Sequence, residues 1–270
     1  MYITKETAIL VISFGTSYEQ TRKKTIEQIE KNIHDTYPDL PLYRAWTSPH
    51  IRRKLQERDH MHIMDIAEAM DQMHADGIRN VVIQPTYVIT GFEYDTMKKE
   101  ILKFEKNFDS VIICDSLIAT QQDKQEICQA LIREYHPASD EVLLFMGHGT
   151  EHIADKLYPE LDRLFKEAGN PNIYMGTVEG NFSIESFLNK LKILNPSHIQ
   201  LAPFMIVAGD HATNDMSGDN KNSWKSILEK GGYHVTCTLK GLGEFQSVRD
   251  IFIRHVETGF KQLSTINSSF

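Results

Sequence analysis

Short runs of apolar and β-branched residues alternate along this chain with longer segments whose apolar side chains recur every three or four positions. The short runs predict strands, over residues 8–14, 42–46, 80–85, 110–114, 141–146, 172–177, 198–203 and 234–238. The longer segments, such as 26–33 and 63–70, predict helices. Strands that alternate with helices form parallel sheets covered by helices on both faces, so the chain is predicted to be an α/β protein.

The two halves of the chain resemble each other. The sequence ILVISFGTS in the first half and the sequence LLFMGHGT in the second both read as a strand followed by a Gly-Thr turn and a helix. The later segments VIQPTYVITGFEYD and IQLAPFMIVAGDHATND can be aligned in the same way, which places Phe14 opposite His148 and Glu93 opposite His211. Ordinary strand-turn-helix segments also share this pattern, and a duplication is the interpretation that we carry forward.

A duplication predicts two similar lobes, each a parallel sheet flanked by helices. The helical pattern breaks at residues 135–141, where Pro and Ser occur, so the predicted domains are residues 1–136 and residues 137–270. In open parallel sheets, ligands bind outside the carboxyl ends of the strands. We therefore expect an active-site cleft between the lobes, with the metal site described below in the second lobe.

Composition excludes several classes of protein. Hydrophobic residues make up 41% of the chain and charged residues 24%, and no apolar run approaches the roughly 20 residues of a membrane helix, so no membrane partner is expected. A formal net charge of -8 disfavours nucleic acid as a partner. The three cysteines, Cys114, Cys128 and Cys237, have no paired spacing, which argues against disulfides and thiolate metal sites. The first residues read as a strand and not as a signal peptide, so a cytoplasmic location is expected.

Three side chains that commonly bind metals follow predicted strands of the second half. His148 lies between two glycines, Glu179 follows the next strand, and His211 ends the apolar run FMIVAGD. Each alone is compatible with a turn or capping role, but the carboxyl ends of parallel strands meet at one edge of a sheet. Two imidazoles and one carboxylate suit divalent Fe, Co, Ni or Zn and leave coordination positions open for chemistry. Asp210 or Asp215 is expected to accept the second N–H of His211.

Other strand ends of the first half carry polar residues. Residues 13–17, with the sequence SFGTS, are compatible with an anion site at a helix N-terminus or with an ordinary helix cap. Their single glycine matches neither nucleotide-binding motif, so nucleotide binding is unsupported. Arg52, Arg53 and Lys54 predict a basic rim or a solvated helix face, and Glu93 predicts a turn carboxylate or a group that faces the metal.

Taken in order, these motifs resemble those of a known family over about residues 8–255. The matching segments are VISFGTS, RAWTS, GFEYD, FMGHGT, VEG, IVAGDHATNDMSGD, SW and GLGE. They are similar to the anaerobic cobalt chelatase family, the CbiK type of sirohydrochlorin cobaltochelatase. The resemblance implies a class II chelatase fold and a lyase that inserts Co(II) into sirohydrochlorin, or precorrin-2, without ATP in anaerobic cobalamin synthesis.

The resemblance also implies roles for individual residues. The metal ligands of the family fall on His148, Glu179 and His211, and the glutamate that lies near its macrocycle falls on Glu93. Because two pyrrole protons must leave, His148 is expected to accept one of them, with His211 and Glu93 as the other catalytic groups. The segment PHIR after TS and the segment GNFS after Glu179 depart from the family pattern and leave the substrate contacts there open.

The tetrapyrrole is expected to be held by anion-binding groups and by apolar side chains. The expected substrate-binding residues are Ser13, Phe14, Gly15, Thr16, Ser17, Phe92, Phe204, Met205, Gly209 and Asp210. No cofactor is expected beyond the substrate metal, Co2+ or alternatively Fe2+ or Ni2+. A zinc-dependent hydrolase and a non-catalytic tetrapyrrole or metal carrier remain the alternatives, and the oligomeric state is open, a homo-oligomer included.

Overall fold

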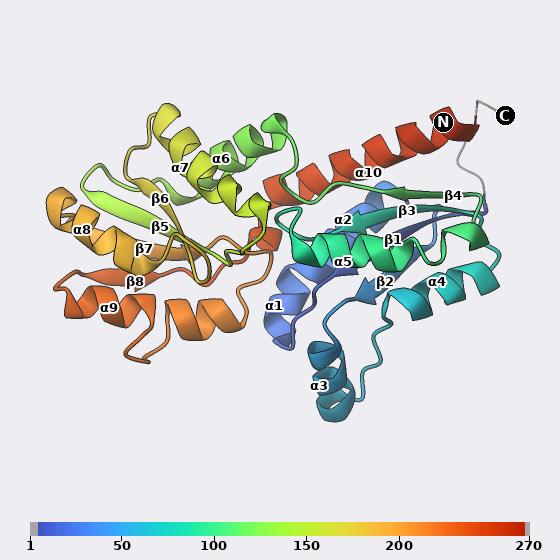
Figure 1. Cartoon of the computed structure of the whole chain (residues 1–270), viewed down its shortest axis with the longest axis horizontal. Coiled ribbons are helices and arrows are strands. Elements are labelled where there is room, and N and C mark those ends of the chain that lie inside the picture. Colours follow the sequence, from blue (N-terminus) through green and yellow to red (C-terminus); the bar gives the residue numbers. More distant parts are fainter. Residues whose placement is uncertain (1–4, 268–270) are drawn as a thin grey trace. The chain divides into compact units, whose positions relative to one another are not determined.

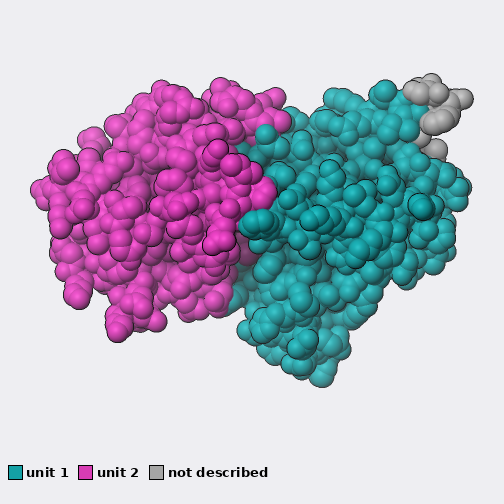
Figure 2. Space-filling model, in the orientation of Figure 1, with its two compact units in different colours: residues 1–119, 246–270 teal, residues 120–245 magenta. Residues whose placement is uncertain are grey.

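The computed structural model describes residues 5–267, which form two compact units, each built on one parallel sheet (Figure 1). The first unit comprises the residues up to 119 together with those from 246 onward, and the second comprises residues 120–245 (Figure 2). Residues 1–4 and 268–270, at the outer ends of the two predicted domains, lie outside the described residues. The α/β class and the two similar lobes predicted from the sequence are confirmed.

The first unit has a four-stranded parallel sheet in the order β2-β1-β3-β4. Its strands are β1 (Thr7–Ser13), β2 (Leu42–Trp46), β3 (Asn80–Pro85) and β4 (Ser110–Ile113). Its helices are α1 (Glu19–Lys24), α2 (Ile26–Thr36), α3 (Pro49–Asp59), α4 (Ile66–Ala75), α5 (Phe92–Ile101) and α10 (Gln246–Asn267), with a 3-10 turn at Glu105–Asn107. Alternate residues of β1, such as Leu10 and Ile12, pack with α4 and α5 on one face. Helices α2 and α10 cover the other face, so the strands are buried on both sides.

The second unit repeats this topology in the order β6-β5-β7-β8. Its strands are β5 (Glu141–Gly147), β6 (Ile173–Thr177), β7 (His198–Pro203) and β8 (Val235–Cys237). Its helices are α6 (Gln121–Tyr135), α7 (Leu157–Glu167), α8 (Ile184–Leu194) and α9 (Trp224–Lys230), with 3-10 turns at Ile153–Lys156 and Leu242–Glu244 and a π-helical turn at His211–Met216. Side chains of α8, α9 and the π-helical turn form one core with β5 and β7. The identical strand order in both sheets agrees with the internal similarity of the sequence.

The division of the chain differs from the predicted one at two places. The sequence placed α6 in the first domain and α10 in the second. In the structure α10 packs on β3, β4 and α2, and α6 packs on α7. The fit of α10 on its sheet is close, because a Cβ on Gly259 would lie 2.8 Å from Cys114 Sγ and 2.9 Å from Val82 Cγ1. Sequence order alone does not reveal such a return of the C-terminal helix.

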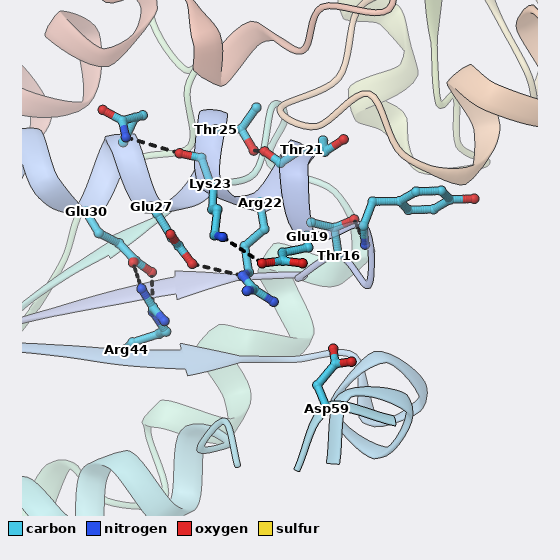
Figure 3. Close-up of polar contacts among 12 residues, drawn as sticks. Thr16, Glu19, Thr21, Arg22, Lys23, Thr25, Glu27, Glu30, Arg44 and Asp59 are labelled. Atoms are coloured by element: carbon cyan, nitrogen blue, oxygen red, sulfur yellow. Dashed lines mark hydrogen bonds and ion pairs between the residues drawn. The ribbon is translucent and has the colours of Figure 1, made fainter. Parts of the chain in front are cut away.

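Polar groups join α2 to the sheet of the first unit and to α1 (Figure 3). Arg44, on β2, donates through Nε to Oε1 of Glu30, on α2, at 2.8 Å, and Arg22 Nε donates to Glu27 Oε1 at 2.8 Å. Burial raises the pKa of Glu30, and the hydrogen bond and charge of Arg44 oppose that rise. Burial alone would lower the pKa of Arg44, but its contacts with Glu30 outweigh burial and raise it. The two groups therefore form an ion pair at the edge of a core.

Two further expectations concern the described residues. Within residues 5–267, no helix is long and apolar enough to cross a membrane. Cys114, Cys128 and Cys237 are all unpaired, as their spacing predicted. Burial raises the pKa of Cys114 and of Cys128 to about 12, so neither thiol ionises readily.

Candidate functional site

The loops that follow β5 and β6 hold each other at the carboxyl edge of the second sheet. The amide of Val178 donates to the carbonyl of Gly147 at 3.0 Å, and the amide of Glu179 donates to the carbonyl of His148 at 2.8 Å. These two hydrogen bonds extend the parallel pairing of the strands by one step beyond their ends. His148 and Glu179 consequently leave the sheet side by side, as the sequence predicted for strand ends.

Gly149 makes this close approach feasible. Its φ of +81° lies in the region that favours glycine, and a Cβ there would overlap the carbonyl oxygen of Glu179 and lie 2.8 Å from Cβ of Thr177. Gly149 also donates its amide to the hydroxyl of Tyr158 at 3.3 Å. The GHG sequence therefore serves to bring two loops into contact, as expected from its two glycines.

The first unit contains the equivalent loops. The amide of Thr47 donates to the carbonyl of Ser13 at 2.9 Å, and the amide of Ser48 donates to the carbonyl of Phe14 at 3.2 Å. This is the hydrogen-bond pattern of the second unit, with Phe14 in the place of His148, as the sequence alignment predicted. By the same pattern Ser48 corresponds to Glu179, a match that the sequence comparison had not identified.

His148 lies within reach of two other candidate residues. Its Nδ1 is 2.9 Å from the carbonyl of Gly149, which can only accept, so Nδ1 is the donor, and in the neutral ring Nε2 then has its lone pair free. The carboxylate of Glu179 lies 4.0 Å from Nδ1, and the His148 and His211 rings are 4.8 Å apart, nearly perpendicular at 86°. The side chain of His148 is 46% exposed and that of Glu179 is 61% exposed, so solvent reaches both.

His211 is the first residue of the π-helical turn His211–Met216. Its Nδ1 lies 2.6 Å from Oδ2 of Asp215, which accepts the hydrogen bond. Of the two aspartates that the sequence offered, Asp215 is the one joined to His211 Nδ1, and the Oδ1 of Asp210 accepts from Asn214 Nδ2 at 2.9 Å. Single π-helical turns are rare in proteins overall, and those that occur are often found at functional sites.

The structure thus brings His148 near both Glu179 and His211, and the Nδ1 atom of each histidine is hydrogen-bonded. Among the described residues, however, no group of three or more His, Cys, Asp or Glu side chains is arranged to hold a metal ion. The approach of His148 to Glu179 and to His211 agrees with the sequence, and the assignment of the three side chains as metal ligands stays a prediction. Unprotonated imidazole nitrogens beside a carboxylate can bind a divalent cation or accept a proton.

Three predicted substrate-binding residues of the first unit lie inside the fold. Ser13 is buried and its hydroxyl accepts from the hydroxyl of Thr86 at 2.8 Å. Thr16 is also buried and its hydroxyl accepts from the amide of Tyr18 at 3.3 Å. At Gly15, where φ is +101°, a Cβ would lie 2.5 Å from the Trp46 ring. Helix α1 begins only at Glu19, so the expected anion site of residues 13–17 at a helix N-terminus is not formed.

Among the first-unit residues that were predicted to contact the substrate, the exposed ones are mainly aromatic. Phe14 is 50% exposed and Phe92 is 53% exposed, which is unusual for phenylalanine. Both follow neighbouring strands, β1 and β3, at the carboxyl edge of one sheet. The carbonyl of Ser17 accepts from Arg58 Nη2 at 2.8 Å, and Glu93 is exposed on the first turn of α5.

In the second unit, one predicted substrate contact is a core residue. Phe204 is 1% exposed and packs edge to face with Phe145, at 6.1 Å between ring centroids. Its expected contact with a macrocycle is therefore not supported, because the residue after β7 points into the core. Met205 is partly buried, Gly209 accepts through its carbonyl from the amide of Thr213 at 3.0 Å, and Asp210 is exposed.

Comparison with known proteins assigns the chain to a family. The family model of cobalt chelatase (CbiK) matches residues 7–261. The chain belongs to the cobalt chelatase (CbiK) family. It is 35% identical over 251 residues to a sirohydrochlorin cobaltochelatase of Salmonella typhimurium, covering 92% of this chain and 94% of the relative. It is 28% identical over 260 residues to the sirohydrochlorin cobaltochelatase CbiKC of Nitratidesulfovibrio vulgaris, covering 94% and 91%.

Solved structures of this fold include other chelatase-like proteins. SirB from Bacillus subtilis with Fe3+ superposes with a TM-score of 0.66 at 10% identity, covering 94% of this chain and 95% of that one. DR2241 from Deinococcus radiodurans, described as structurally similar to chelatases, gives a TM-score of 0.64 at 10% identity, covering 95% and 56%. At such low identity these likenesses concern the fold alone, and they agree with the two-lobed α/β architecture of a cobalt chelatase.

The basic segment of this cobalt chelatase family member borders a hollow of about 310 Å3 in the first unit. It is lined by Pro49, Arg52, Arg53, Gln56, His62 and Ile63. The four lining residues of α3 follow helical spacing and share one face, and this spacing is the sequence signal that would identify Gln56. Arg52 is tied to Asp65 by an ion pair of 3.2 Å, whereas Arg53 and Lys54 are exposed. The sequence predicted a basic rim but not the hollow or the part of His62 in it.

Proposed function

We propose that this protein inserts Co(II) into sirohydrochlorin, or its precursor precorrin-2, without ATP, as a cobaltochelatase of anaerobic cobalamin synthesis. Membership of the cobalt chelatase family over residues 7–261 supports this reaction. The single structural observation that supports it is the distance of 4.8 Å between the ring centroids of His148 and His211, with Nδ1 of each ring already hydrogen-bonded. With both rings neutral, that arrangement would offer two Nε2 lone pairs at the carboxyl edge of the second sheet.

The reaction needs groups that take protons and groups that hold the ion briefly. A free-base tetrapyrrole loses two N–H protons when a divalent metal enters, and histidine is the side chain best matched to accept protons near neutral pH. His211, which is held by Asp215, would ligate the ion together with His148 and Glu179. His148, the more exposed of the two, would then accept a proton on Nε2 as the macrocycle nitrogens replace it on the metal.

A protonated His148 would face a carboxylate. Its Nδ1–H side lies 4.0 Å from Glu179, so the positive charge gained on proton transfer is partly balanced at the moment it forms. Glu93, the residue of the first unit that corresponds to His211 in the internal similarity, would be the second proton acceptor. Proton transfer by positioned groups of this kind contributes typically about 10²–10⁴-fold to a rate.

The substrate surface calls for two kinds of contact. Sirohydrochlorin is a flat macrocycle with an apolar face and carboxylates on its rim. Phe14, Phe92 and the partly buried Met205 would contact the face, and Arg53 would pair with a rim carboxylate. Ser17, Gly209 and Asp210 would complete the contacts through polar and main-chain groups. A cytoplasmic site of action is part of the same proposal.

The proposal is tested by following the absorbance of sirohydrochlorin with purified protein and Co(II), with Fe(II) and Ni(II) in parallel. His148→Ala and His211→Ala are expected to fold normally and to lose about 100-fold or more of the insertion rate. His234→Ala is the matched control, because His234 is exposed and precedes β8 at the opposite edge of the same sheet. Full activity in either test variant would refute the assignment of that residue, and faster insertion of Fe(II) or Ni(II) would reject cobalt as the metal.

A further inference from the structure

The π-helical turn His211–Met216 pairs residues that lie four apart. Its main chain is wider than an α-helix, as in the hydrogen bond from the amide of Ser217 to the carbonyl of Ala212, five residues earlier. Two side-chain pairs, each between residues four apart, form along this turn. Asn214 donates to Asp210 at 2.9 Å, and His211 is joined to Asp215 at 2.6 Å. The turn therefore supplies the hydrogen-bond partner of the imidazole from its own sequence.

The bond between His211 and Asp215 decides which ring nitrogen carries the hydrogen. An ionised carboxylate has only acceptor atoms, so the nitrogen that faces it, Nδ1, must be the donor. In the neutral ring Nε2 then has its lone pair free, which is the form that binds metals. Metal-binding histidines commonly donate their other N–H to a carboxylate, which fixes the tautomer and orientation of the ring and raises its strength as a ligand.

The other candidate histidine is fixed differently. Nδ1 of His148 is hydrogen-bonded to the carbonyl of Gly149, a main-chain group that no substitution removes. His211 depends instead on one side chain, and that side chain is 48% exposed and contributes nothing to the buried core. Asp215 is therefore a residue whose removal should alter the imidazole and leave the fold unchanged.

We propose that Asp215 is a positioning residue, which holds His211 in the Nδ1–H tautomer and so presents Nε2 to the substrate metal. The structural part of this inference stands on the geometry of the turn, and its catalytic part rests on the proposed chelatase function. Asp215 does not touch the metal or the macrocycle and acts through His211 alone. Its effect is expected on metal affinity, where partners of this type contribute about 10- to 100-fold.

The tautomer is measured directly by long-range 1H–15N correlation of the histidine rings in full-length, metal-free protein. The spectrum is recorded at alkaline pH, in the range where the ring signals no longer change with pH and the ring is therefore neutral. The chain has 12 histidines, and the His211 signals are identified by their loss in His211→Gln. The native protein is expected to show a protonated Nδ1 and an unprotonated Nε2 at His211. Asp215→Ala should give a mixture of tautomers, and Asp215→Asn, whose amide can donate, should favour Nε2–H.

Binding of Co(II) to the same proteins, followed by titration calorimetry, links the tautomer to the metal. Asp215→Ala is expected to weaken Co(II) binding about 10- to 100-fold, and Asp215→Glu is expected to restore most of it. Asn214→Ala is the matched control, since it removes the neighbouring side-chain bond of the same turn and should change neither the tautomer nor the affinity. Unchanged circular dichroism and thermal midpoint in all variants would show that the turn is intact.

The outcomes separate this inference from the proposed function. An Nε2–H tautomer or a mixture in the native protein would overturn it, whatever the enzyme activity. An unchanged tautomer in Asp215→Ala, or equal losses of affinity in Asp215→Ala and Asn214→Ala, would also overturn it. If the native protein has the expected tautomer but does not insert cobalt, the proposed function fails and the role of Asp215 toward His211 stands.

Discussion

At the scale of single residues, Gly149 and Gly169 form a natural pair for comparison. Their φ angles are +81° and +80°, so an alanine at either position would adopt an unfavourable left-handed conformation. The surroundings differ, because a Cβ at Gly149 would overlap the loop of Glu179, whereas nothing lies within 4 Å of a Cβ at Gly169. Strain and steric overlap can therefore be separated within one protein.

Gly169→Ala is expected to lower the free energy of unfolding by about 1–2 kcal/mol, the cost of the left-handed conformation. Gly149→Ala is expected to cost at least about 2 kcal/mol more, because the loops of His148 and Glu179 must separate. The measurement is urea unfolding at equilibrium together with the rate of cobalt insertion, which should fall only in Gly149→Ala. Equal losses of stability in the two variants would show that the contact of the two loops is unimportant.

Individual site residues could be predicted where local chemistry decides their position. The glycines around His148 and the succession of His, Glu and His at strand ends were enough to predict which side chains share an edge. Whether Ser13 and Phe204 face a ligand or the core could not be predicted, because it depends on the direction in which the chain leaves each strand. The choice between Asp210 and Asp215 depended on a π-helical turn, which has no clear sequence signal.

At the scale of elements, the ion pair between Arg44 on β2 and Glu30 on α2 offers a test of how a helix is attached to a sheet edge. Glu30 is 5% exposed and Arg44 shields its charge. Because burial raises the folded-state pKa of Glu30, the contribution of this carboxyl to stability is present at low pH and is lost as pH rises through that pKa. Removing Arg44 should raise the pKa of Glu30 further, so that more stability is lost as the pH rises.

Arg44→Met is therefore expected to lower the free energy of unfolding at pH 7 by about 2–3 kcal/mol, less than a fully buried pair because the arginine is one-third exposed. The loss should shrink as pH falls, since a protonated Glu30 needs no ionic partner. Lys31→Met, which breaks the exposed pair with Asp35 on the same helix, is the control and should have little effect at any pH. A loss that stays constant from neutral to acid pH would contradict the role of Glu30.

The strands were the elements best predicted from sequence. Their bounds agree with prediction within one or two residues, because buried parallel strands are short apolar runs that end at turn residues, as in β3 (Asn80–Pro85) and β7 (His198–Pro203). Helices were less well delimited. Residues 19–36 are divided into α1 and α2 at Thr25, whose hydroxyl donates to the carbonyl of Thr21, and apolar spacing does not report this break in the main chain.

At the scale of the whole molecule, the return of α10 to the first unit determines which pieces of the chain can fold. Its apolar face buries Val248, Ile251, Phe252, Val256, Phe260 and Leu263. Full burial of one such side chain contributes about 1.5–3 kcal/mol, so loss of α10 would remove an amount comparable to the net stability of about 5–15 kcal/mol that is typical of a domain. The sequence could predict two lobes from the repeated motifs, but not this crossing, because the apolar stripe of a helix does not specify the sheet that it covers.

A fragment of residues 120–245 is therefore expected to fold alone, with native-like circular dichroism and a cooperative urea transition. A fragment of residues 137–270, which has almost the same length, should aggregate, because it lacks α6 and carries α10 without the sheet on which that helix packs. Size-exclusion chromatography and urea unfolding of the two fragments, with the full-length chain as reference, compare the two divisions directly. A soluble, cooperative 137–270 fragment beside an aggregated 120–245 fragment would show that the stability of each lobe follows sequence order and not the packing of α10.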